Sequence, residues 1–152
     1  MNIPKSHPRF LSLQIREKLV KGFKNNLVAK EGLLAHGRGE AFDYIIGEKT
    51  SKFAKQAIKS AANMLNDAQN SVISVNGNFA ALCSKEIIQL AKSTNSKIEV
   101  NLFYSSEKRK KAIIKILKES GAKEILGIDK KSSTKLGGID SARRIVDKNG
   151  IF

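Results

Sequence analysis

The alternation of short β-branched runs with helical segments between residues 71 and 127 constrains the fold of this chain more than any other feature of its sequence. Three runs are typical of strands: residues 71–75, 97–103 and 124–127. Two helical segments separate them, one from about Phe79 to Ala91 and one that begins at Ser105 or Ser106 and ends before Gly121. Strands that alternate with helices of this length predict an α/β fold with a parallel sheet, right-handed crossovers and flanking helices.

The front of the chain is predicted to be helical, with Pro8 near the first helical position. Apolar residues that recur every four positions indicate a first helix packed on one side: Leu11, Ile15, Leu19, Phe23 and Leu27. A second helix, from a Thr50 cap to about Ala68, also has its apolar residues on one side: Phe53, Ala54, Ala57, Ile58, Ala61, Met64 and Leu65.

These patterns predict one α/β domain over residues 1–152, with a helical part at 1–70 and a strand–helix part at 71–152. The closing Ile151–Phe152 looks like the start of another element. We therefore expect the sheet to be incomplete at its C-terminal side.

The net charge of +14 indicates a partner that carries negative charge. Of the 28 basic residues, 22 are lysines, whereas bidentate phosphate clamps prefer arginine. Aromatic residues make up 6% of the chain and tryptophan is absent, so few side chains could stack on bases. The balance favours a site for small anionic molecules, and a basic module that binds nucleic acid is the alternative.

A single cysteine, Cys83, excludes an intrachain disulfide framework and favours a reducing, cytoplasmic setting. No run of about 18 apolar residues occurs, so we expect no membrane partner. His7 and His36 are the two histidines, and no third ligand at a suitable spacing supports a metal site.

Arg9 and Arg16 are seven residues apart, which places them on the same side of a helix and about 10 Å apart along its axis. Two guanidiniums at this separation could hold different parts of a polyphosphate, or a phosphate and a carboxylate. Two ordinary surface arginines are the alternative interpretation.

The segment His36-Gly37-Arg38-Gly39-Glu40 predicts a loop in which Arg38 reaches a bound anion. A helix from about Glu40 to Ile46 would direct its N-terminus toward the same anion. An ordinary exposed turn is equally compatible with this segment.

Asn76-Gly77-Asn78 follows the first predicted strand, and ligands of open α/β sheets bind at the carboxyl ends of strands. Asn76 and Asn78 are therefore candidate substrate-binding residues, although a plain tight turn would have the same sequence. His7 and Arg9, near the predicted start of the first helix, are further candidates for substrate binding. Neither G-x-G-x-x-G nor G-x-x-x-x-G-K-[ST] occurs, so ordinary dinucleotide and P-loop sites are not supported. The run Lys108-Arg109-Lys110-Lys111 is interpreted as a solvated helix face.

Several long motifs, in order along the chain, resemble the archaeal 4-phosphopantoate–β-alanine ligases, also called phosphopantothenate synthetases. They are Ile3-Pro4-x-Ser6-His7-Pro8-Arg9, Ser12-Leu13-x-x-Arg16-Glu17, Gly32-Leu33-x-Ala35-His36-Gly37-Arg38-Gly39-Glu40-Ala41-Phe42-Asp43-Tyr44, Val72-Ile73-Ser74-Val75-Asn76-Gly77-Asn78 and Glu99-Val100-Asn101-Leu102-Phe103. The chain differs at Tyr104-Ser105-Ser106, where the family often has His-Arg-Thr.

The resemblance implies a Rossmann-like core, a homodimer and no nucleic-acid partner. It also implies ATP-dependent amide formation between 4-phosphopantoate and β-alanine, by way of an acyl-adenylate, with AMP and pyrophosphate as products. This reaction belongs to coenzyme A biosynthesis. ATP would be a substrate, accompanied by Mg²⁺ and contacted by Arg16 and Arg38.

Family members continue well beyond the segment that matches this chain, so the resemblance is to their N-terminal portion. Whether these 152 residues are active alone, or are an inactive fragment of a ligase, is left open by the sequence. No residue is identified as a catalytic base.

Overall fold

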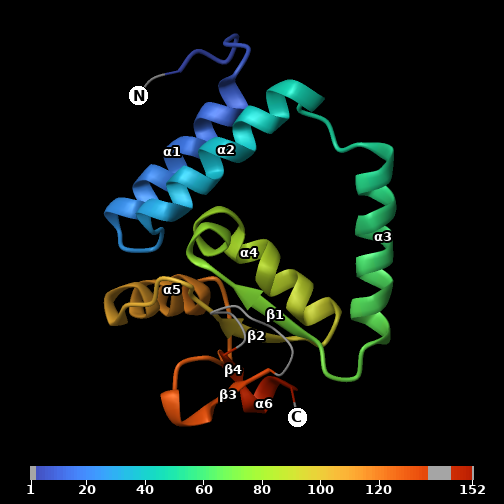
Figure 1. The fold of residues 1–152 in the computed structure, drawn as a ribbon, viewed down its shortest axis with the longest axis vertical. Helices are drawn as coiled ribbons and strands as arrows, with labels where there is room; N and C mark the ends of the chain where they lie inside the picture. Colours follow the sequence, from blue (N-terminus) through green and yellow to red (C-terminus); the bar gives the residue numbers. More distant parts are fainter. Residues whose placement is uncertain (1–2, 137–144, 152) are drawn as a thin grey trace.

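The computed structural model describes residues 3–136 and 145–151. The helices are α1 (Phe10–Lys24), α2 (Lys30–Ile46), α3 (Lys52–Asp67), α4 (Gly77–Ser93), α5 (Glu107–Glu119), the short 3₁₀ helix η1 (Lys130–Ser132) and α6 (Lys148–Ile151). The strands are β1 (Val72–Val75), β2 (Lys97–Val100), β3 (Ser133–Lys135) and β4 (Ile145–Asp147). The predicted α/β class is confirmed: three helices precede a short parallel sheet in the chain, and further helices flank that sheet (Figure 1).

The parallel sheet is formed by β1 and β2, which pair from Val72–Lys97 to Val75–Val100. The third predicted strand, at residues 124–127, forms one isolated parallel bridge between Leu126 and Glu99 instead. The chain leaves the sheet immediately afterwards, because Gly127 has a φ of +80° that few residues other than glycine adopt. The parallel topology is therefore confirmed, but the described residues do not form a full Rossmann-like sheet.

A small second sheet was missed by the sequence analysis. Strands β3 and β4 pair antiparallel through Ser133–Asp147 and Lys135–Ile145. Each has three residues, which is too short for an alternating apolar pattern to stand out. Ile151, expected at the start of a further element, lies in α6, while Phe152 lies outside the described residues.

The prediction of a loop at residues 36–40 is wrong, because α2 continues through this segment from Lys30 to Ile46. Each glycine in a helix costs about 1 kcal/mol relative to alanine, a weak preference that does not end the helix here. A Cβ added to Gly37 or Gly39 would have no heavy atom within 4 Å, so both glycines face open space. The helix N-terminus expected at Glu40 lies ten residues earlier in the chain.

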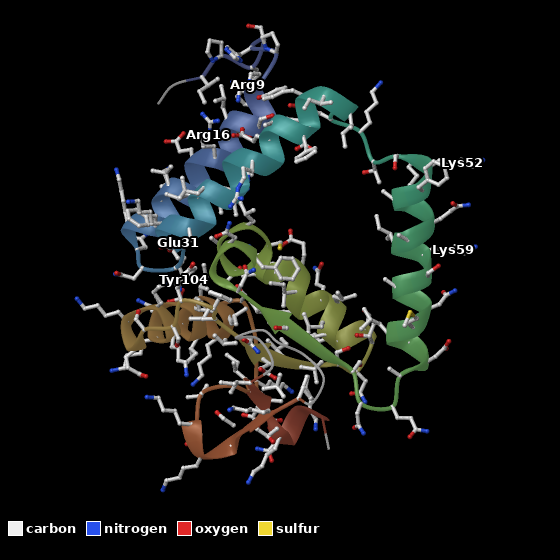
Figure 2. The ribbon with its side chains drawn as sticks, viewed as in Figure 1. Arg9, Arg16, Glu31, Lys52, Lys59 and Tyr104 are labelled. Carbon is white, nitrogen blue, oxygen red and sulfur yellow. The ribbon has the colours of Figure 1, made fainter. Side chains whose placement is uncertain are left out.

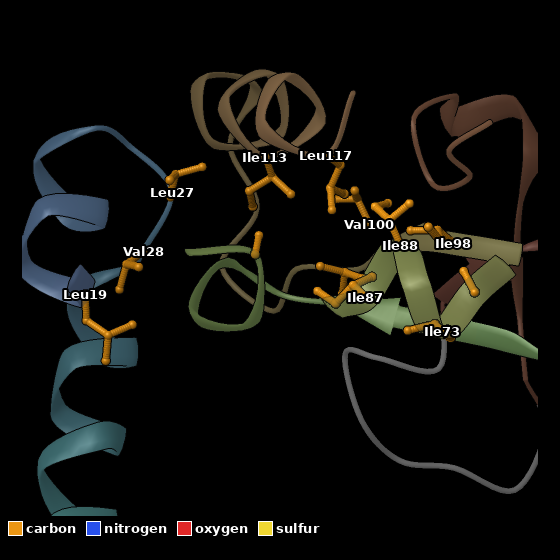
Figure 3. Close-up of a cluster of buried hydrophobic side chains, with 13 residues drawn as sticks. Leu19, Leu27, Val28, Ile73, Ile87, Ile88, Ile98, Val100, Ile113 and Leu117 are labelled. Atoms are coloured by element: carbon orange, nitrogen blue, oxygen red, sulfur yellow. The ribbon is translucent and has the colours of Figure 1, made fainter. Parts of the chain in front are cut away.

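The core lies between the parallel sheet and the helices α4 and α5, and it extends to α1 (Figure 3). It contains Leu19, Leu27, Val28, Ile73, Val75, Ala80, Ile87, Ile88, Ala91, Ile98, Val100, Ile113 and Leu117. Of the four-residue repeat predicted for the first helix, Leu19 is buried in α1, and Leu27 is buried just after it. Leu11, Ile15 and Phe23 remain exposed, so the helix is packed over a narrower stripe than the repeat predicts.

Helix α3 forms as predicted, but its apolar side chains are not buried. Its cap is Ser51 rather than Thr50, because the Ser51 Oγ accepts a hydrogen bond of 3.1 Å from the Ala54 N–H. None of its residues is buried, and the side chains of Phe53, Ile58 and Met64 are 80%, 62% and 73% exposed. The helix stands apart from the other helices (Figure 1), so its apolar side lacks a cover in the described chain. Within residues 3–136 and 145–151, no helix is both long and apolar enough to cross a membrane.

Candidate functional site

A cavity of about 370 Å³ lies where the carboxyl ends of β1 and β2 meet the N-terminal half of α2. Its walls come from three parts of the chain: α2 with its preceding residue, the turn after β1, and the segment from the end of β2 to the first turn of α5. The lining residues are Ala29, Glu31, Gly32, Ala35, Arg38, Asn76, Gly77, Asn78, Leu102, Phe103, Tyr104 and Arg109. Figure 2 shows Glu31 and Tyr104 close together at this junction.

The two asparagines predicted from the sequence both lie at this cavity. The Asn76 Oδ1 accepts a hydrogen bond of 2.9 Å from the Phe79 N–H and so caps α4. The Asn78 Nδ2 donates to the Gly32 carbonyl at 2.9 Å, which ties the turn after β1 to the first turn of α2. A Cβ at Gly32 would lie 2.3 Å from the Asn78 Oδ1, so glycine is required for this close approach.

Arg38 also lines the cavity, although it is part of a helix rather than of the predicted loop. Residues two apart on an α-helix point to nearly opposite sides. Arg38 can therefore line the cavity while Glu40 is buried against α1. Among the described residues, Arg38 makes no ion pair.

Arg109 is a cavity residue that the sequence analysis missed. Its Nη2 donates to the Leu27 carbonyl at 3.2 Å, and its Nη1 donates to the Tyr104 carbonyl. Burial lowers the pKa of the Arg109 guanidinium, whereas the nearby Glu31 carboxylate raises it. The sequence spacing could have indicated a partly buried Arg109. It precedes Ile113 by four residues, so the two share a helix face, and Ile113 is fully buried.

Arg9 and Arg16 meet at a different place, between α1 and α2. The Arg9 Nη2 lies 3.4 Å from the Glu40 Oε1, and the Arg16 Nη2 and Nε lie 2.5 and 3.2 Å from its Oε2. The two arginines, which the sequence predicts on one side of a helix about 10 Å apart, both bind the buried Glu40 carboxylate. Figure 2 shows both arginines along α1.

His7 lies in the exposed turn before α1, where its Nδ1 accepts a hydrogen bond of 3.0 Å from the Arg9 N–H. The Arg9 guanidinium also lies over the Tyr44 ring, 4.8 Å from its centroid. The six predicted residues therefore form two groups. Arg38, Asn76 and Asn78 line the cavity. Arg9 and Arg16 bind Glu40, and His7 contacts the Arg9 N–H beside them.

The cavity carries two guanidiniums and one carboxylate, so its walls favour anions. Asn76 and Asn78 add amide groups that can exchange their present partners for a ligand hydroxyl or carboxylate. Among the described residues, no group of three or more His, Cys, Asp or Glu side chains could hold a metal ion. Glu31, the one carboxylate on the wall, fits a Mg²⁺ ion that is held mainly by substrate phosphates.

A larger hollow of about 620 Å³ lies at the opposite, amino ends of β1 and β2. Its cations are Lys92, Lys97 and Lys123, whose side chains are flexible and strongly hydrated. The smaller cavity is the better candidate because it combines arginines, a capped helix start and the carboxyl edge of a parallel sheet.

Comparison with known proteins places the chain in a family. The profile of the phosphopantothenate/pantothenate synthetase family matches residues 53–152. The 4-phosphopantoate–β-alanine ligase of Thermococcus onnurineus is 49% identical over 100% of this chain, and that of Methanosarcina mazei is 45% identical over 99%. The corresponding ligase of Methanospirillum hungatei is 54% identical over 78% of the chain.

The chain spans 58% of the length of the Thermococcus and Methanosarcina relatives and 49% of the Methanospirillum one. The match to the Thermococcus onnurineus ligase covers the whole chain and therefore includes every residue that lines the cavity. The chain is accordingly a member of the phosphopantothenate/pantothenate synthetase family.

Proposed function

We propose that this chain contributes the phosphate-binding part of a ligase that joins 4-phosphopantoate to β-alanine with ATP, forming 4′-phosphopantothenate, AMP and pyrophosphate. The observation that carries the proposal is the cavity at the carboxyl ends of β1 and β2, in which Arg38 and Arg109 converge with two asparagines. The proposal is supported by the relatives, whose names describe them as 4-phosphopantoate–β-alanine ligases.

The chemistry explains why such a site needs fixed cations. A carboxylate is a poor electrophile toward an amine, so the carboxylate of phosphopantoate first attacks the α-phosphate of ATP and displaces pyrophosphate. The β-alanine amine then attacks the acyl-adenylate, and AMP leaves. Both ligands of the first step are anions, and guanidiniums held in place offset their repulsion and the charge that develops on the phosphoryl oxygens.

We assign ATP contacts to Arg38 and Arg16, and substrate contacts to Asn76, Asn78, Arg9 and His7. Glu40 holds the Arg9 and Arg16 guanidiniums in a defined place. Part of each side chain remains accessible, 36% for Arg9 and 48% for Arg16, so donors are available to a ligand.

Mg²⁺ would accompany ATP, and Glu31 is the residue on the cavity wall that could contact it. When bound, the ion would neutralise charge on the nucleotide phosphates. We place this reaction in coenzyme A biosynthesis in the cytoplasm.

The test is a pyrophosphate-release assay on the gene product at its native length, with ATP, Mg²⁺, 4-phosphopantoate and β-alanine. We expect release that requires all of the substrates, and an Arg38→Ala variant with a KM for ATP raised about tenfold or more, as for loss of a charge-assisted contact. Because Gly37 and Gly39 leave Arg38 with little packing, the thermal midpoint should hardly change. Release that is independent of phosphopantoate would contradict the proposal.

We also propose that the active form is a homodimer. The exposed apolar side of α3, which includes Phe53, Ile58 and Met64, supports a second copy as its cover. Self-association through such a face buries the same surface of both copies.

A further inference from the structure

The guanidinium of Arg109 joins two segments that are far apart in the sequence. Its Nη2 binds the Leu27 carbonyl, 82 residues away, in the connection between α1 and α2. Its Nη1 binds the Tyr104 carbonyl, in the segment that follows β2. Tyr104 belongs to one of the three parts of the chain that form the cavity, and Leu27 lies two residues before Ala29, where another part begins. Arg109 itself is one of the lining residues.

The third part meets the other two at the same point. Gly77, the first residue of α4, is buried, and a Cβ added to it would lie 2.0 Å from the Leu27 carbonyl oxygen and 2.8 Å from the Arg109 Nη2. Only glycine lets the turn after β1 approach so closely. The Arg109 guanidinium therefore lies where the α1–α2 connection, the start of α4 and the segment after β2 converge.

The chemistry of this contact requires arginine. The planar guanidinium presents donors in fixed directions and can bind two carbonyls at once, whereas a lysine ammonium at the same distance cannot reproduce that geometry. Lys108 and Lys111 are exposed and Lys110 is half-buried like Arg109, but Arg109 is the member of this run whose side chain binds backbone carbonyls.

We propose that Arg109 is a positioning residue of the active site. By holding the Leu27 and Tyr104 carbonyls, it sets the start of α2, with Glu31 and Arg38, relative to Asn76 and Asn78. The inference rests on the proposed ligase function for its effect on catalysis, but the junction itself is independent of that function.

The experiment compares Arg109→Lys and Arg109→Gln with the wild type and with Lys108→Gln, a matched control one residue away. In the native-length protein we expect kcat/KM for ATP and phosphopantoate to fall about 10- to 100-fold in both Arg109 variants, as displacements near 1 Å can cause. The Lys108 variant should keep wild-type kinetics. Arg109→Lys retains the positive charge, so a lower kcat/KM in this variant reports a change in geometry rather than in electrostatics.

Amide hydrogen exchange gives a readout that does not depend on the reaction. Exchange in residues 25–29 and 102–105 should become faster in Arg109→Lys, while the core of α5 around Ile113 stays protected. Wild-type kcat/KM together with unchanged exchange in these segments would overturn the inference. A wild-type protein without ligase activity, in which Arg109→Lys still accelerates exchange, would refute the proposed function and leave the positioning role standing.

Discussion

At the residue scale, the interaction of Glu40 with two arginines links α1 to α2 through a carboxylate that is almost completely buried. A buried acceptor with several charged donors contributes more than a surface ion pair, because its removal leaves the donors without a partner. Arg9 and Arg16 are partly exposed and can regain water, which limits the loss.

We therefore expect Glu40→Gln to lower the free energy of unfolding by about 1.5–3 kcal/mol, the range for hydrogen bonds to charged groups. Urea unfolding of the native-length protein measures this change in the free energy of unfolding. Glu48→Gln is the matched control, because Glu48 is exposed and accepts a single hydrogen bond from the Ser12 Oγ. Equal stabilities for the two variants would show that the Glu40 cluster does not hold the helices together.

A second buried carboxylate, Glu99, lies at the edge of the sheet beside Asp147. Its Oε1 accepts a hydrogen bond from the Asn101 Nδ2 at 3.0 Å, and its Oε2 accepts one from the Asp147 N–H at 3.3 Å. Burial raises the pKa of Glu99, and the Asp147 charge raises it further, while the two hydrogen bonds lower it. The net direction is upward.

A raised pKa means that the folded protein binds the Glu99 proton more tightly than the unfolded chain does. The contribution of Glu99 to stability should consequently decrease as the pH rises from its ordinary value near 4.5 through the raised folded value. We expect the stability of the wild type relative to Glu99→Gln to fall over this window in urea unfolding at several pH values. A difference between wild type and Glu99→Gln that grows with pH would contradict the assignment.

The residues predicted from the sequence illustrate which rules transfer to structure. Asn76 and Asn78 were found because the carboxyl ends of parallel strands form an edge at which ligands bind, and this depends on topology alone. The sequence predicted Arg38 as an anion contact in a loop. The residue is part of α2 instead, and its position on that helix places it at the cavity. Arg109 was missed because the lysines around it suggested a solvated face, while its partners are backbone carbonyls distant in sequence.

At the scale of elements, α3 shows the limit of pattern analysis. The periodicity of its apolar residues predicted an amphipathic helix correctly, but periodicity cannot specify what covers the apolar side. Likewise, residues 124–127 have the composition of a strand, but the positive φ of Gly127 ends the pairing after one bridge.

The proposed dimer gives α3 a testable role. We expect Phe53→Ser combined with Ile58→Ser to convert the native-length protein from a dimer to a monomer in light scattering, because both side chains are exposed and apolar. Lys52→Ser combined with Lys59→Ser, on the same helix (Figure 2), is the control for changes in helix propensity. A dimer that survives the first pair of changes would exclude α3 as the interface.

At the scale of the whole molecule, the arrangement of elements determines where substrates can bind. Two hollows flank the parallel sheet, one at each end of its strands. The one at the amino ends is larger, but only the one at the carboxyl ends is lined by arginines, of which Arg109 is held by two backbone carbonyls. The net charge of +14 attracts anions to the entire surface and therefore does not distinguish the two.

The most direct test of the account is to locate the bound substrate by NMR, using the ¹⁵N-labelled native-length protein titrated with 4-phosphopantoate and, separately, with ATP. The account predicts chemical-shift changes that cluster at residues 29–38, 76–79 and 102–109, around the cavity at the carboxyl ends of β1 and β2, and at residues 7–16 beside Glu40. Changes that cluster instead around Lys92, Lys97 and Lys123, at the opposite end of the sheet, would contradict it.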